Sequence, residues 1–316
     1  MLSLILKSSV LLSLFSSVKA SLGNTFPTYR YCVEQCREAI CDEAGVHYKS
    51  YVPVPLSSKF LWSCNDNCQY ECMWDTVRVF QEKGWLPPQF HGKWPFIRFL
   101  GVQEPASTAF SLLNLGIHLK MFKQFLREVR RTNPMFKIWI IYAMCSINGW
   151  VWSSIFHTRD LPFTELMDYL SAFGMVLCTA YSIGMRLLLK FHQVYSLLFT
   201  AVTVAYFVNH ATYLSWGLFD YKYNMIANLV AGVILFVNCV IFSLVYWRSL
   251  PQSKSLLIAI GILAISLYLE LSDFSPIWWT FDAHALWHLT TAPVTYYYWK
   301  FILEDSKHLQ KEIPRW

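Results

Sequence analysis

The feature that most constrains this chain is a series of long apolar runs separated by short charged clusters. The runs lie at residues 104–122, 136–157, 165–189, 193–214, 223–247, 254–271 and 281–302. Most of them approach the roughly 20 residues that an α-helix needs to cross a bilayer. Charged residues make up only 15% of the 316 residues, against about a quarter in a typical soluble chain. The sequence therefore predicts an all-α membrane protein with seven transmembrane helices, the first of them weakened by Asn114 and His118.

Basic residues collect on alternate connections between these runs, which predicts the orientation of the helices. The connection over residues 120–137 holds six lysines and arginines, the third holds Arg186 and Lys190, and the fifth and the tail are also basic. The other connections carry mostly Asp and Glu. The positive-inside rule assigns basic loops to the cytosol, so we expect a luminal N-terminus and a cytosolic C-terminus. Topology then accounts for most of the net charge of +6, and no nucleic-acid partner is needed.

The N-terminus is typical of a secretory signal peptide. Lys7 precedes an apolar run over residues 10–18, and small residues around Ala20 offer a cleavage site. The alternative is a further transmembrane helix, but the run is short and broken by serines. We therefore expect the mature chain to begin near Ser21, inside the secretory pathway.

Six of the nine cysteines lie in one short segment that would face the oxidising lumen, where disulfides form. Helical spacing, four residues, separates Cys32 from Cys36 and also separates Cys64, Cys68 and Cys72. Two antiparallel helices joined as a ladder would pair Cys32–Cys72, Cys36–Cys68 and Cys41–Cys64. Six cysteines allow 15 pairings, so the connectivity stays open, and a zinc ribbon is a rival despite its different usual spacing. The expected domains are a signal peptide (1–20), a luminal cysteine-rich domain (21–98), a seven-helix domain (99–303) and a cytosolic tail (304–316).

Ionisable side chains inside a bilayer are costly, so each one is a candidate functional residue. His157 ends the second run, Asp168 lies just inside the third, and His284 and His288 share one face near the start of the last. At 1.5 Å per residue, all of them belong to one luminal layer. Ser153 lies one helical turn before His157 and shares its face.

Three neutral imidazoles are the ligand set of a catalytic zinc with one position open to water. The sequence therefore predicts zinc on His157, His284 and His288, with Asp168 orienting the water or accepting its proton and Ser153 bonding the water or the developing oxyanion. The alternative is that these histidines only hydrogen-bond between helices. Packing is also the expected role of His118 and of His210 with its neighbour Asn209, and Cys145, Cys178 and Cys239 are expected to act as small hydrophobic residues.

These residues resemble the shared pattern of the CREST superfamily of seven-helix hydrolases and receptors: Ser-x-x-x-His, an Asp in the next helix and a late His-x-x-x-His. Within it, the chain resembles the post-GPI-attachment-to-proteins factor 3 family. The stretches that carry the resemblance are residues 64–74, 89–96, 103–107, 156–160 and 282–288. Two departures are visible, Gly23-Asn24-Thr25 before the first cysteine and Ser275-Pro276 before the last helix, and both lie away from the histidine layer.

The resemblance implies hydrolysis of the sn-2 acyl ester of the phosphatidylinositol in a GPI anchor, with GPI-anchored proteins as substrates. It also implies a Golgi membrane location, with the endoplasmic reticulum as the alternative. Rival functions are a ceramide amidase with the same site, a receptor with a structural zinc, and a non-catalytic folding or transport factor for GPI-anchored proteins. Oligomeric state and metal identity stay open.

Overall fold

The computed structural model describes residues 21–56, 61–216 and 219–312, so the expected signal peptide lies outside the described residues. Across these ranges the chain is helical, with isolated β-bridges and no strand. It divides into two compact units, each with its own packing. The first comprises the described residues up to Glu104 together with Phe274–Asp282, and the second comprises Pro105–Asp273 and the described residues from Ala283 onward.

The described part of the first unit contains three helices: α2 (Leu22–Thr25), α3 (Pro27–Ile40) and α4 (Cys64–Glu82). Proline at the first position of α3 suits a helix start, because its missing N–H has no partner there in any case. Helix α4 begins with a capping box, in which the Ser63 side chain accepts from the Asp66 N–H at 3.1 Å and the Asp66 carboxylate accepts from the Ser63 N–H at 2.9 Å. These caps fix where the two cysteine-bearing helices begin.

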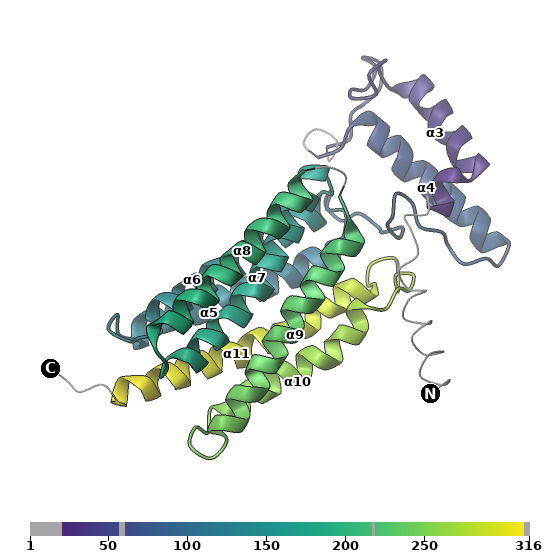
Figure 1. Ribbon diagram of the computed structural model, residues 1–316. Helices are drawn as coiled ribbons and strands as arrows, with labels where there is room; N and C mark the ends of the chain where they lie inside the picture. The colour runs from purple at the N-terminus through teal and green to yellow at the C-terminus, as the bar shows by residue number, and fades with distance from the viewer. Residues whose placement is uncertain (1–20, 57–60, 217–218, 313–316) are drawn as a thin grey trace, which may run out of the picture. The chain divides into compact units, whose positions relative to one another are not determined.

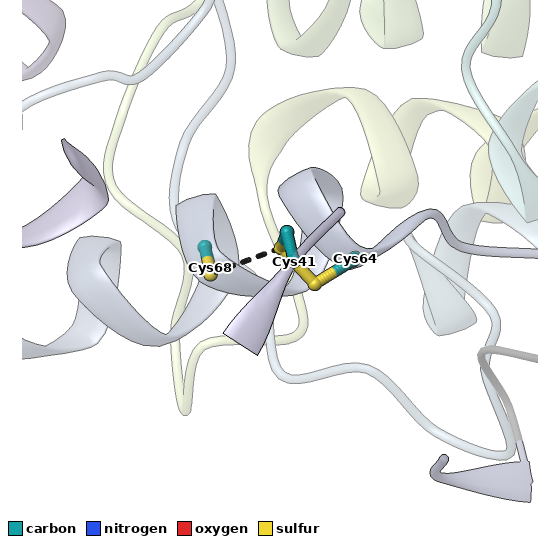
Figure 2. A group of neighbouring side chains, drawn as sticks. All are labelled: Cys41, Cys64 and Cys68. Carbon is teal, nitrogen blue, oxygen red and sulfur yellow. Dashed lines mark hydrogen bonds between the residues drawn. A yellow bond between two sulfur atoms is a disulfide. The ribbon is translucent and has the colours of Figure 1, made fainter. Parts of the chain in front are cut away.

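Three disulfides join α3 and the residue that follows it to α4, in the pairing that the helical spacing favoured. Cys32 bonds Cys72, Cys36 bonds Cys68 and Cys41 bonds Cys64, with Cα–Cα distances of 5.7, 5.7 and 5.6 Å. The sulfur of Cys68 also lies 3.9 Å from that of Cys41 (Figure 2). Because all six sulfurs are oxidised, none is a thiolate that could bind a metal, and the zinc-ribbon alternative is wrong.

Removal of the central disulfide by the double change Cys36→Ser and Cys68→Ser is expected to destabilise the first unit by about 2–5 kcal/mol. The cross-link lowers the conformational entropy of the unfolded chain. A small unit with few buried side chains depends on this effect for its stability. Thermal unfolding and limited proteolysis of the full chain in detergent would measure the loss. Cys145→Ser, which changes a free cysteine of the second unit, is the control, and equal stability of the two variants would contradict the prediction.

His91 gives the first unit a dependence on pH. Its backbone N–H donates to Asn24 Oδ1 at 2.8 Å, so the Asn24 Nδ2 group faces His91 Nδ1 at 3.3 Å and donates to it. The ring proton is therefore on Nε2, which donates to the Tyr29 hydroxyl at 3.0 Å. Burial lowers the pKa of His91 below its ordinary value of 6.5, against a smaller opposing effect of Asp66. Burial also raises the pKa of Tyr29 to about 12, so this hydroxyl stays neutral.

Stability of the first unit is expected to fall as the pH drops below about 6.5, because the unfolded chain then binds a proton that folded His91 refuses. Above about pH 6.5 the contribution of His91 to the stability of the folded unit is fully present. As the pH falls, this contribution decreases until the pH reaches the lower pKa that His91 has in the folded state. Thermal unfolding of the full chain across this range would show the slope, and His91→Gln is expected to flatten it. His47→Gln, at an exposed site, is the control. If stability depended on pH equally steeply in the His91→Gln and His47→Gln variants, the assignment to His91 would be refuted.

Among the described residues of the second unit there are seven helices, which run alongside one another (Figure 1). They are α5 (Pro105–Glu128), α6 (Phe136–Thr158), α7 (Pro162–Leu188), α8 (Gln193–Ser215), α9 (Tyr221–Tyr246), α10 (Ser253–Glu270) and α11 (Ala283–Glu312). Five of them, α6 to α10, are long and apolar enough to cross a membrane. Helices α5 and α11 are equally long and more polar, so composition supports five of the seven expected spans.

Helix α11 lies in the interior of this unit, where its side chains contact α6, α7 and α9 as well as its two main neighbours. Helix α11 packs against α5 and α10, α5 against α6, and α6 against α7. An aromatic core includes Trp139, Tyr142 and Trp299, with the Tyr142 and Trp299 rings 5.5 Å apart. Helix α8, in contrast, buries only His210 and Leu214 among its described residues. The result is an inner set of helices that can hold polar groups away from lipid.

The last helix continues beyond the expected end of the seventh span at residue 302. Asp305 is fully buried and accepts two hydrogen bonds from Arg186, at 2.6 and 2.9 Å. Arg186 was expected in the third connection between the apolar runs. It instead lies inside α7, where the Asp305 carboxylate neutralises its charge. The domain boundaries expected from the sequence stay predictions, although segment 274–282 packs with the first unit.

Candidate metal centre

Three histidines come together at one end of the second unit, called here the histidine end, where α6 and α10 finish and α5, α7 and α11 begin. His157 is in the last turn of α6, and His284 and His288 are in the first two turns of α11. One ring nitrogen from each lies within 4.8 Å of the others. The ring centroids are 5.2 Å apart for His157 and His284, 5.1 Å for His157 and His288, and 4.6 Å for the α11 pair.

Glu270, at the end of α10, orients His284. Its Oε2 lies 2.9 Å from His284 Nδ1. A carboxylate only accepts hydrogen bonds, so the ring proton of neutral His284 is on Nδ1 and its Nε2 carries a lone pair. In the sequence, Glu270 is one of the acidic residues of the connections, and its contact with His284 was not predicted. A carboxylate at a helix C-terminus opposes the helix dipole, and this unfavourable position was the signal that could have identified it.

Ser111 of α5 links His288 to Ser153. Its Oγ lies 3.1 Å from His288 Nδ1, 2.9 Å from Ser153 Oγ and 2.8 Å from the Ser107 carbonyl oxygen, to which it can donate. Ser111 is fully buried. Ser111 was not among the site residues predicted from the sequence, although Ser107, Ser111 and Asn114 share one face of α5 at helical spacing.

Asn114 fixes the backbone of α11 next to the site. Its amide donates to the His288 carbonyl oxygen at 2.8 Å, and its own oxygen accepts from Thr295 at 3.0 Å. His288 is therefore held at both its ring and its backbone by α5. Asn114, which weakens the apolar pattern of the first run, is therefore the residue that joins α5 to the last helix, α11.

The contact between the two α11 histidines shows whether the site fits a metal. Their Nε2 atoms face one another at 2.9 Å, and His284 presents a lone pair there. Two lone pairs at this distance repel one another, so the contact needs either a proton or a metal cation between the two nitrogens. His157, buried beside them, adds a third imidazole, and Glu270 supplies the carboxylate–histidine pairing common around bound metals. These residues fit the ligand set of a catalytic zinc.

The other expected site residues are placed as follows. Ser153 is buried one turn before His157 and joins the cluster through Ser111. Asp168 lies in the second turn of α7 at the histidine end and is partly buried. Its carboxylate is not among the mutually close ligand atoms of the described residues, so its role in catalysis stays a prediction.

Two further membrane histidines belong to packing, as expected from the sequence. His118 Nδ1 accepts from the Trp299 indole N–H at 2.9 Å. His210 is fully buried against Phe173, with ring centroids 3.8 Å apart, and stacks on Tyr223 on another side. Neither belongs to the histidine cluster.

Comparison with known proteins places these features in a family. The chain is 41% identical over 92% of its length to the Drosophila melanogaster protein named post-GPI attachment to proteins factor 3, covering 90% of that protein. It is 39% identical to both the mouse and the human proteins named GPI-specific phospholipase A2-like PGAP3, over 92% of this chain and 91% of each relative. No solved structure matches the chain significantly.

The family model described as the Per1-like family matches residues 55–306. That range contains α4, the three histidines, Ser111, Ser153, Asp168 and Glu270. The match therefore covers the whole candidate metal centre and most of the chain. The chain belongs to the Per1-like family.

Proposed function

We propose that the chain hydrolyses the sn-2 acyl ester of the phosphatidylinositol in a GPI anchor, using zinc held by His157, His284 and His288. The observation that carries this proposal is the convergence of three imidazoles with their lone-pair nitrogens inside a helical bundle. The names of the relatives, which combine GPI attachment with a phospholipase A2-like activity, suggest the substrate class.

Each residue has a defined task in this reaction. The three histidines would hold zinc, which would supply an activated water and polarise the ester carbonyl. Glu270 and Ser111 orient His284 and His288, and Asp168 is proposed to accept the proton of the attacking water. The water oxygen bonds to the carbonyl carbon, and the ester C–O bond to the glycerol breaks. The glycerol oxygen takes up the proton, so the products are a free fatty acid and lyso-GPI.

The proposal includes a topology that suits this substrate. Helices α5 and α11 are counted as the first and seventh spans, because they supply Ser111, Asn114, His284 and His288 to the interior of the same bundle. The disulfide-linked first unit and the histidine end then face the lumen of the Golgi, or of the endoplasmic reticulum. GPI anchors occupy the luminal leaflet, so the ester and the site lie on the same side.

Mass spectrometry of GPI anchors in cells that lack the endogenous activity tests this function. Expression of the chain is expected to convert anchors with an unsaturated sn-2 chain to lyso-GPI, and empty vector is expected to leave them unchanged. Loss of the sn-1 chain, or unchanged anchors at matched expression, would contradict the assignment. Changed ceramide levels with unaltered GPI anchors would identify the ceramide amidase instead.

A further inference from the structure

We propose that two turns of the first unit insert their apolar side chains into the surface of the lipid bilayer. The turns span residues 97–102 and 276–281, and the Ile97 N–H donates to the Trp279 carbonyl oxygen at 2.9 Å between them. The proposed lipid-contacting surface, called here the apolar tip, consists of the exposed apolar side chains of the two turns: Ile97, Phe99, Leu100, Ile277 and Trp278. The proposed hydrolysis gives these residues no role.

The backbone of both turns holds bulky residues in a conformation that they seldom adopt. Leu100 has a φ of 50°, and Trp278 and Trp279 have φ angles of 52° and 57°. These angles lie in the left-handed region, where glycine and asparagine are common and a bulky side chain is an outlier. Strained backbone of this kind concentrates at functional sites. A leucine and a tryptophan kept at these positions therefore point to a task that needs large apolar side chains.

The strained residues also expose their side chains. Leu100 is 85% exposed, Trp278 is 79% exposed, and Phe99 beside Leu100 is 64% exposed. Single exposed apolar side chains are ordinary on a protein surface, but a group of them marks a contact with a protein or a membrane. Because a hydrogen bond joins the two turns, their exposed side chains belong to one group.

Contacts with the rest of the first unit hold both turns in place. The Trp62 indole N–H donates to the Gly101 carbonyl oxygen at 2.8 Å, and Trp62 is itself buried. In the other turn, the ring of Trp279 packs edge-on against Trp74 of α4, with ring centroids 5.3 Å apart. The apolar tip is therefore formed before it meets a partner, so binding costs little conformational entropy.

The position of the turns in the chain identifies a lipid surface as the partner. Helix α10, which is long and apolar enough to cross a membrane, ends at Glu270, eight residues before Trp278. Leu100 precedes Pro105, the first residue of α5, by five residues, and five residues span at most about 18 Å. Aromatic side chains, tryptophan above all, are enriched where protein meets the membrane–water interface. A bilayer surface is thus within short chain reach of the apolar tip in every copy of the protein.

Insertion into lipid would offset the unfavourable backbone of the turns. Transfer of large apolar side chains out of water is favourable in proportion to the apolar area removed. Asparagine at positions 100 and 278 would relieve the backbone strain, since it tolerates positive φ, but it would lose this transfer. Polar and apolar replacements at these two positions therefore separate the role in lipid contact from a role in folding.

Spin labelling of the full chain in phosphatidylcholine nanodiscs measures the contact directly. A nitroxide attached through Phe99→Cys is expected to collide with oxygen, which concentrates in lipid, and to be protected from a water-soluble nickel chelate. Leu86→Cys is the control, because Leu86 is 84% exposed in the same unit and lies outside both turns, and its label is expected to be accessible to nickel. The unaltered chain, treated identically, gives the background from its free cysteines.

Two double variants that carry the label at position 99 form a matched pair. Leu100→Asn with Trp278→Asn is expected to move the label into water, with loss of oxygen access and gain of nickel access. Leu100→Met with Trp278→Phe keeps the apolar character and is expected to leave the label in lipid. Limited proteolysis is expected to show the first unit equally folded in both, because asparagine suits the left-handed positions.

Three results would overturn the proposal. The first is a label at position 99 that is as accessible to nickel as the label at position 86. The second is equal immersion of the label in the polar and apolar double variants. The third is protection of the label from both oxygen and nickel, which would assign the apolar tip to a protein contact instead of lipid.

Discussion

His288→Ala is expected to lose bound zinc and to lower the rate of GPI-anchor ester hydrolysis by on the order of 10³-fold or more. A bound metal supplies several kcal/mol of stabilisation to the charge that develops on the ester oxygen, and each 1.36 kcal/mol is tenfold in rate. His288 is held at ring atom Nδ1 by Ser111 and at its backbone carbonyl oxygen by Asn114. Metal analysis and a hydrolysis assay on the same purified sample would measure both effects.

His118→Ala is the matched control for this prediction. It removes an equally buried imidazole that bonds to Trp299 and lies outside the histidine cluster. We expect it to lower stability through the lost packing while leaving the zinc content unchanged. A His288→Ala protein that keeps both zinc and activity would show that the cluster is only a contact between helices.

Loss of one partner of the Arg186–Asp305 pair is expected to destabilise the second unit by about 3–5 kcal/mol. Both side chains are almost fully buried, and they make two hydrogen bonds between α7 and α11. Asp305→Ala leaves a guanidinium charge in the interior without its counter-charge, and this uncompensated charge causes the loss. Thermal unfolding of the purified chain in detergent is the measurement.

The double change Arg186→Met and Asp305→Leu is expected to recover most of that stability, because an apolar pair removes the cost of burying two charges. Lys307→Ala is a useful comparison, since it breaks a partly exposed pair with Glu128 and is expected to change stability by about 1 kcal/mol or less. If Asp305→Ala were no worse than Lys307→Ala, the buried pair would have no structural importance.

Local spacing predicted the parts of the structure that depend on a single helix face. Cysteines four residues apart suggested the ladder between α3 and α4 as one of 15 possible pairings, and the structure has this pairing, in which each pair of side chains meets at the same height on antiparallel helices. Depth along the helices likewise predicted which histidines would meet at one end. These arguments need only the helical repeat and the order of the helices.

Contacts between residues on helices far apart in the sequence could not be predicted from local patterns. Ser111 looked like one of several serines in a weak apolar run, and its contact with His288 depends on α5 packing against α11. Asp305 appeared to belong to a charged tail, because nothing in the local sequence reveals that Arg186 neutralises it. Segment 274–282 joins the first unit through its fold, including a hydrogen bond from the Ile97 N–H to the Trp279 carbonyl, which no composition change indicates.

Release of fatty acid from a GPI lipid by the purified chain, before and after zinc is removed and restored, tests the central claim most directly. The account predicts that the sn-2 fatty acid is released by the zinc-loaded protein, that release stops when a chelator has removed the metal, and that added zinc restores it. Unchanged sn-2 release from protein shown by metal analysis to contain no zinc would contradict the account.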